Sequence, residues 1–123
     1  MLSIDVEKSE HVAVARCVGR LVRGEAIHTL NNAVINENDT RIIMLDLSDV
    51  DAIDAGGLSA LVCLHEWTES RGIQLKLVNP SHFVREVLER TGLDRVFEIT
   101  SLHDALVVLG DERYASSQHA LCC

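Results

Sequence analysis

The residues best suited to chemistry lie together at one junction, between a run of apolar residues and a pair of glycines. Asp46, Asp49, Asp51 and Asp54 lead up to Gly56-Gly57. A helix that begins at this pair leaves backbone N–H groups unpaired in its first turn, where the helix dipole favours a negative charge. Asp54 is placed to cap that helix. The junction therefore predicts a capped helix start that presents charge and bare N–H groups to a ligand or a partner.

Catalytic motifs are incomplete at this junction. The segment Gly57-Leu58-Ser59-Ala60-Leu61 begins like the G-x-S-x-G turn of serine hydrolases, but Leu61 stands where the second glycine is required. The sequence also lacks the phosphate-binding patterns G-x-x-x-x-G-K and G-x-G-x-x-G. We therefore expect no catalytic residues, no cofactor and no enzymatic activity.

The histidines and cysteines do not form a metal-binding pattern. None of the six histidines belongs to an H-x-x-x-H or H-E-x-x-H motif. His119, Cys122 and Cys123 offer soft-metal ligands near the C-terminus, but a structural zinc site takes four. The spacing of Cys17, Cys63 and this terminal pair is no disulfide framework. We expect no metal site and reduced thiols, as is typical of the cytosol.

Strand-like and helix-like patterns alternate along the chain. Alternating apolar residues predict a hairpin of two strands near a sheet edge. Its strands are expected over residues 2–6 and 11–18, and further strands over 41–47, 73–78 and 96–99. Helices are expected from residue 25, over 55–70, after the cap Ser81, and over 102–109 after the cap Ser101. Residues 19–24 are expected to form a loop or short extended piece and 48–54 an acidic connector. This order predicts one α/β domain with a mixed or parallel sheet.

The helix expected over residues 55–70 has two different sides. At 100° per residue, one side gathers the residues that we expect to be buried: Gly57, Ala60, Leu61, Leu64 and Thr68, with Leu58 flanking. The opposite side carries Ser59, Cys63, Glu66 and Ser70, with Val62 and Trp67 at the borders. A helix that is apolar most of the way round is either deeply buried or faces a partner.

Composition limits the classes of partner. The chain has 123 residues, is 47 % hydrophobic and carries a net charge of -8. Such a charge repels polyanions, which argues against nucleic acid and anionic membrane as main partners. No apolar stretch approaches the length of a membrane span and no signal peptide is visible. We therefore expect a soluble cytoplasmic protein without membrane insertion, with a domain over residues 1–110 and a frayed tail over 111–123.

Several segments, in the right order, resemble the STAS family of bacterial anti-sigma factor antagonists and their relatives. The family pattern is an apolar strand, an acidic connector and a D-[ST]-[ST]-G-L turn that opens a helix. Here these parts read Ile42 to Leu47, Asp49 to Asp51 and Ile53 to Leu58. The resemblance runs from about Ser3 to Gly110 and includes Gly19-Arg20-Leu21, the strand Ile73 to Pro80, and Val84 to Leu93 with its Thr91-Gly92-Leu93 ending.

The resemblance implies a mixed sheet of about four or five strands with about four helices, mainly on one face. It also implies regulated binding of an anti-sigma factor, kinase-like, or of another regulatory protein. We predict that the contact residues are Asp54, Ala55, Gly56, Gly57, Leu58, Ser59, Val62, Cys63 and Glu66. In this interpretation Asp54 caps the helix and presents charge, and the two glycines admit a partner's backbone.

The chain departs from the family at the switch position. In the family a phosphorylatable Ser or Thr stands directly before the G-L of the turn, and phosphate there releases the partner by adding negative charge. Gly56 occupies that position and Ala55 precedes it, so neither offers a hydroxyl. Ser48 and Ser59 are hydroxyl residues nearby, but neither matches the motif, which argues against either as a substitute site. The resemblance thus predicts docking without the usual phosphoswitch.

Two further functions stay open at this point. Single-domain relatives also serve as subunits of lipid-transport ATPase complexes or of larger signalling assemblies. A different class of function is sensing of a small anion or nucleotide at the N–H groups of residues 55–57, against which the acidic surroundings argue. Whether the chain forms a homodimer is also left open.

Overall fold

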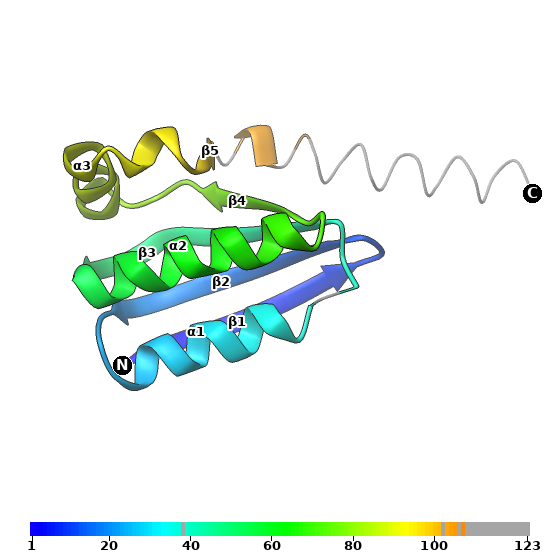
Figure 1. The fold of residues 1–123 in the computed structure, drawn as a ribbon, viewed down its shortest axis with the longest axis horizontal. Helices are drawn as coiled ribbons and strands as arrows, with labels where there is room; N and C mark the ends of the chain where they lie inside the picture. Colours follow the sequence, from blue (N-terminus) through cyan, green and yellow to red (C-terminus); the bar gives the residue numbers. More distant parts are fainter. Residues whose placement is uncertain (38, 102, 106, 108–123) are drawn as a thin grey trace, which may run out of the picture.

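The computed structural model describes residues 1–37, 39–101, 103–105 and 107, and these form one five-stranded sheet with helices (Figure 1). The strands lie side by side in sequence order, as β1 (Leu2–Ser9), β2 (Val12–Leu21), β3 (Ile42–Ile53), β4 (Gln74–Val78) and β5 (Glu98–Thr100). The helices are α1 (Glu25–Ile35), α2 (Ala55–Ser70), α3 (His82–Thr91) and the 3₁₀ helix η1 (Leu93–Arg95). The predicted α/β class is confirmed.

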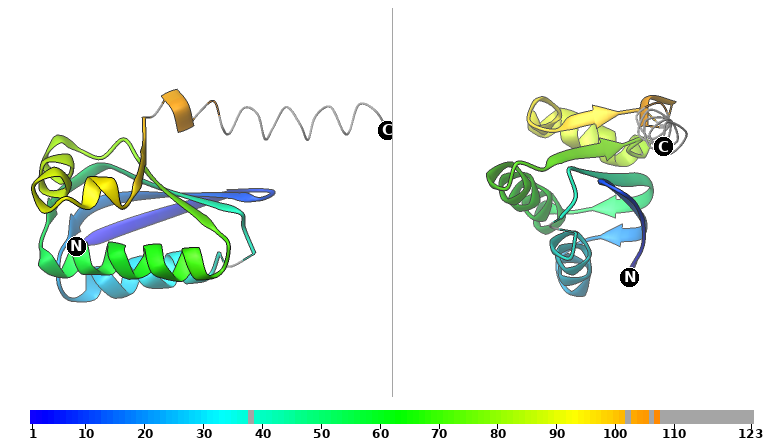
Figure 2. Two further views of the ribbon diagram at one scale, coloured as in Figure 1. Left: turned by 45° about the horizontal axis from the view of Figure 1, so that its top comes forward. Right: turned by 90° about the vertical axis from the view of Figure 1, so that its right-hand side faces the viewer.

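The sheet is mixed because only its first pair of strands is antiparallel. β1 pairs with β2 as a hairpin and forms one edge of the sheet, as predicted. All later neighbours are parallel, and a helix connects each pair of them. Right-handed crossovers that advance in one direction along a sheet place their helices on the same face. In agreement, α1 and α2 lie side by side on one face (Figure 2).

The main core fills the space between this face and the helices. Strand positions that point towards α1 and α2 are buried, including Ala15, Leu45 and Leu77. α3 adds Val84 and Leu88 to the same cluster, so the helices lie mainly on one face as expected. The buried side of α2 is the predicted one and consists of Gly57, Ala60, Leu61, Leu64 and Thr68.

Several predicted strand boundaries were wrong: β1 ends at Ser9 and not at residue 6, and β5 begins at Glu98 and not at residue 96. The largest differences, in β2 and β3, have one cause. β2 continues through Gly19 to Leu21, and β3 continues through the expected acidic connector to Ile53. The two extensions pair with each other in parallel, with irregularities in the register after Arg16 and Gly19. Every third residue of this part of β3 is buried (Leu47, Val50 and Ile53), whereas Asp49 and Asp51 are exposed. Asp49 and Asp51 face outward from a strand. In the sequence alone, such exposed aspartates resemble the polar residues of a connecting loop.

The last described residues begin the segment that follows β5. The Asp104 N–H donates to the Ser101 hydroxyl at 3.1 Å, which confirms the predicted cap. The expected tail over 111–123, with His119, Cys122 and Cys123, lies outside the described residues. Within the described part, no helix is both long and apolar enough to cross a bilayer.

Candidate functional site

The start of α2 is organised by the side chain of Asp54. This residue is the N-cap of α2, and its Oδ1 accepts a hydrogen bond from the Gly57 N–H at 2.9 Å, as predicted. Both of its carboxylate oxygens also accept the Arg23 N–H, at 3.1 and 3.0 Å. These N–H groups, first that of Arg23 and then that of Gly57, hold the pKa of Asp54 below its ordinary value. One carboxylate thus connects the β2–α1 turn to α2.

This geometry changes the interpretation of the bare N–H groups. The carboxylate of Asp54 already binds the donor of Gly57 in the first turn of α2. A small anion would have to displace the Asp54 carboxylate before it could bind the Gly57 N–H. Of the three N–H groups at residues 55–57 on which the anion-sensing hypothesis depended, that of Gly57 is therefore already occupied.

The two glycines have different neighbours. A Cβ at Gly57 would lie 2.2 Å from the Leu21 carbonyl oxygen and 2.9 Å from Ile53 Cγ1, so only glycine fits there. Gly57 is buried and its close contact is made inside the chain. A Cβ at Gly56 would lie 3.1 Å from Arg23 Cβ, which is tight but closer to tolerable. Gly57 is therefore glycine because of packing within the chain, and the role of admitting a partner's backbone stays a prediction for Gly56.

The exposed side of α2 forms one wall of a groove whose other wall is α1. Ser59, Cys63 and Glu66 are exposed as predicted, while Leu58 and Val62 are half-buried against the core. A hollow of about 400 Å³ lies between the helices. We call it the α1–α2 groove, and it is lined by Arg23, Ile27, Asn31, Ala55, Gly56, Ser59, Ala60 and Cys63. Of the predicted contact residues, the groove gathers Ala55, Gly56, Ser59 and Cys63.

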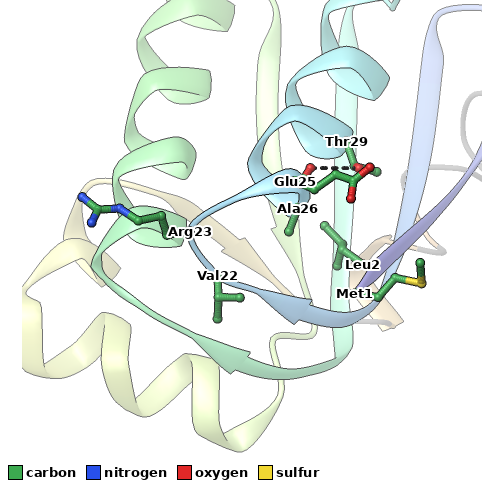
Figure 3. Close-up of a pocket in the computed structure, with 7 residues that line it drawn as sticks. All are labelled: Met1, Leu2, Val22, Arg23, Glu25, Ala26 and Thr29. Atoms are coloured by element: carbon green, nitrogen blue, oxygen red, sulfur yellow. Dashed lines mark hydrogen bonds between the residues drawn. The ribbon is translucent and has the colours of Figure 1, made fainter.

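The α1 wall of this groove was missed in the sequence. Arg23, Ile27 and Asn31 follow one another at intervals of four, which is the spacing of one helix face. That spacing indicates a common face but not which helix it will meet. Arg23 also borders a second hollow of about 360 Å³, between α1 and the start of β1 (Figure 3). Its guanidinium points away from that hollow.

The other acidic residues of the junction do not join the site. Asp46 lies in the middle of β3, where its Oδ1 accepts the Ser48 hydroxyl at 2.6 Å and the Ser48 N–H at 3.0 Å. Ser48 is half-buried and already hydrogen-bonded, whereas Ser59 is exposed. In the described part of the chain, no three His, Cys, Asp or Glu side chains are grouped so that they could hold a metal ion.

Several known proteins are similar to this chain in sequence or in structure. The chain is 31 % identical over 91 residues to sulfate transporter 2.2 of Arabidopsis thaliana, a match that covers 72 % of this chain but only 13 % of the transporter. A crystal structure from Thermotoga maritima, assigned as an anti-sigma factor antagonist, is 28 % identical with a TM-score of 0.72 and covers 84 % of this chain and 91 % of that one.

A further solved structure extends this likeness. An anti-sigma factor antagonist of Mycobacterium paratuberculosis is 25 % identical with a TM-score of 0.68, covering 88 % of this chain and 93 % of that chain. The family model described as the STAS domain matches residues 3–106, which is most of the sequence. On this match, and on the mixed sheet with its helix-opening turn, the chain belongs to the STAS domain family.

Proposed function

We propose that the chain is a protein-interaction module that binds a regulatory protein, of the anti-sigma factor class, along the α1–α2 groove. The observation that carries this proposal is the groove itself, which begins at the turn fixed by Asp54 and runs between two exposed helix faces. The likeness to anti-sigma factor antagonists supports the class of partner. No reaction is part of the proposal, and a cytoplasmic location agrees with it.

The lining of the groove suits a protein partner. Ala55, Gly56 and Ser59 have small side chains, which let a partner's backbone or helix come close to α2. Ile27 supplies half-buried apolar surface between them and the polar groups of Arg23 and Asn31 at the rim. An apolar centre with a polar rim is the usual anatomy of a protein–protein interface.

The proposed binding is independent of phosphorylation at position 56. Gly56 has no hydroxyl, and the Cβ and Cα of Arg23 lie 3.1 and 3.3 Å from where a Cβ at this position would be. The neighbouring turn therefore crowds the space that a switch side chain would need. Ser59 is an exposed hydroxyl residue in the groove, although it does not match the family motif, and phosphosite mapping tests whether it is modified.

The test starts from the partner in its native extract. The chain is used as bait, captured proteins are identified, and the purified candidate is titrated against variants. We expect Ser59→Glu to weaken binding by about tenfold or more, because it places a charge and extra volume in the groove. Ser70→Glu is the matched control, since Ser70 is exposed at the far end of the same helix and does not line the groove. Equal affinities for the two variants would refute the location of the site.

A second candidate function is regulation of a membrane-transport assembly, of which a lipid-transport ATPase complex is one kind. The observation in its favour is the 31 % identity to a sulfate transporter. The same bait experiment in detergent extract distinguishes the two functions. Capture of a transport protein that binds wild-type chain but not Ser59→Glu would favour this assembly over an anti-sigma factor.

A further inference from the structure

No helix of the described residues lies over β1 and β2 on the sheet face turned away from α1 and α2 (Figure 2). Val12, Met44 and Val78 form a second small core there together with Ala105, the only one of these four that comes from beyond the sheet. Other side chains of the same face are charged or exposed. This part of the surface lies on the side of the sheet opposite to the α1–α2 groove.

Charged residues cross three strands in one row on this face. Asp5 on β1 pairs in register with Arg16 on β2, and Arg16 pairs with Asp46 on β3. Arg16 Nε lies 3.8 Å from Asp46 Oδ2. In the adjacent row Glu7 pairs with Val14. These residues line a hollow of about 300 Å³, and we call them the outer acidic patch: Asp5, Glu7, Val14, Arg16 and Asp46.

The patch has an excess of negative charge next to apolar surface. Its lining holds three carboxylates and one guanidinium. Within the described residues, neither Asp5 nor Glu7 has an ion-pair partner, and both are exposed. In the row beyond Arg16, Val18 pairs with Asp49 and is 45 % exposed, which is high for a valine on a sheet. In the described part of the chain, this surface thus combines an excess of carboxylates with one exposed valine, which is complementary to a segment that carries both cations and apolar side chains.

We infer that the outer acidic patch binds a basic, partly apolar segment of a second protein, while the α1–α2 groove stays free for the first. A lysine or arginine of that segment enters the hollow beside Asp5 and Glu7, and an adjacent apolar side chain covers Val14 and Val18. Because the sheet separates the two surfaces, one copy of the chain can bridge two proteins. The net charge of -8 adds a long-range attraction for such a segment.

The probe is a short acetylated peptide of alternating arginine and valine, titrated at physiological salt into the ¹⁵N-labelled full chain. The expected result is a saturable set of amide shifts confined to residues 3–7, 14–18 and 46–49. The double variant Asp5→Asn/Glu7→Gln should raise the Kd about threefold to tenfold. The matched control is Glu69→Gln/Glu89→Gln, which removes the same charge from exposed positions on α2 and α3 and should leave the Kd unchanged.

Three results would overturn the inference. The first is the same loss of affinity in both double variants, which would mean that the peptide senses only net charge. The second is a set of shifts spread over all acidic surfaces. The third is no localised shift in the full chain but a localised one after removal of residues 108–123, which would assign this face to the chain's own C-terminal end.

Discussion

The backbone N–H of Arg23 donates to both carboxylate oxygens of Asp54, at 3.1 and 3.0 Å. The same carboxylate caps α2 through the Gly57 N–H. Arg23 precedes α1 and Asp54 precedes α2, so this contact fixes the two walls of the α1–α2 groove at the end where both helices begin. A single exposed side chain therefore links the two walls of the proposed docking surface.

Stability at acid pH should depend on this carboxylate. The pKa of Asp54 is lower in the folded chain than its ordinary value of 3.8, first because of the Arg23 N–H. A depressed pKa contributes stability that is complete above the ordinary value and is lost as the pH falls through the lower folded value. Urea unfolding from pH 7 down to pH 2 should therefore show a smaller acid-dependent loss of stability for Asp54→Ala than for wild type. An equal acid-dependent loss of stability in the two proteins would contradict the lowered pKa of Asp54.

The glycine pair should respond unequally to alanine. Gly57→Ala places a methyl group 2.2 Å from the Leu21 carbonyl, so α2 must move away from β2. We expect it to lower the free energy of unfolding by about 3 kcal/mol, as overpacking does. Gly56→Ala meets only contacts of 3.1 Å or more and gains helix propensity, so its effect should stay within about 1 kcal/mol. Chemical denaturation of both variants checks the order, and a larger effect at Gly56 would show that the packing is wrong.

Two cysteines should differ in reactivity. Burial raises the pKa of the Cys17 thiol to about 12, whereas Cys63 is exposed in the groove. Because the thiolate is the reactive form, a maleimide should label Cys63 in the native chain and Cys17 only after denaturation. Peptide mass mapping distinguishes these sites from the C-terminal cysteines. If the groove is the docking site, labelled Cys63 should also block partner binding; a labelled chain that binds normally would count against it.

The cap of α3 should make a measurable contribution to stability. The Ser81 hydroxyl donates to the Val50 carbonyl at 2.6 Å and accepts the Val84 N–H at 3.3 Å, which ties α3 to the end of β3. Ser81→Ala should cost about 1 kcal/mol or more, because it removes a cap and leaves a carbonyl without its donor. Ser59→Ala, at an exposed position, should change stability by less than about 0.5 kcal/mol. Thermal unfolding of the two variants provides the comparison.

The residue pattern within a single helix or strand was enough to predict the features that depend on that element alone. The buried side of α2 follows from its period, and the caps Asp54 and Ser81 follow from residue type and position. The length of β3 could not be predicted in this way, because Asp49 and Asp51 are strand residues only when β2 extends beside them. The contact between Arg23 and Asp54 spans 31 positions in the sequence. No local signal indicates such a contact, and with it the α1 wall of the groove was missed.

The central claim, docking along the α1–α2 groove, is tested most directly by mapping the partner on the ¹⁵N-labelled chain. The captured and purified regulatory protein is added, and amide signals are followed residue by residue. The proposal predicts loss or shift of signals at Arg23, Ile27, Asn31, Ser59 and Cys63, with the signals of α3 unchanged. Perturbations confined to α3, to β5 or to the sheet face opposite the groove would contradict it.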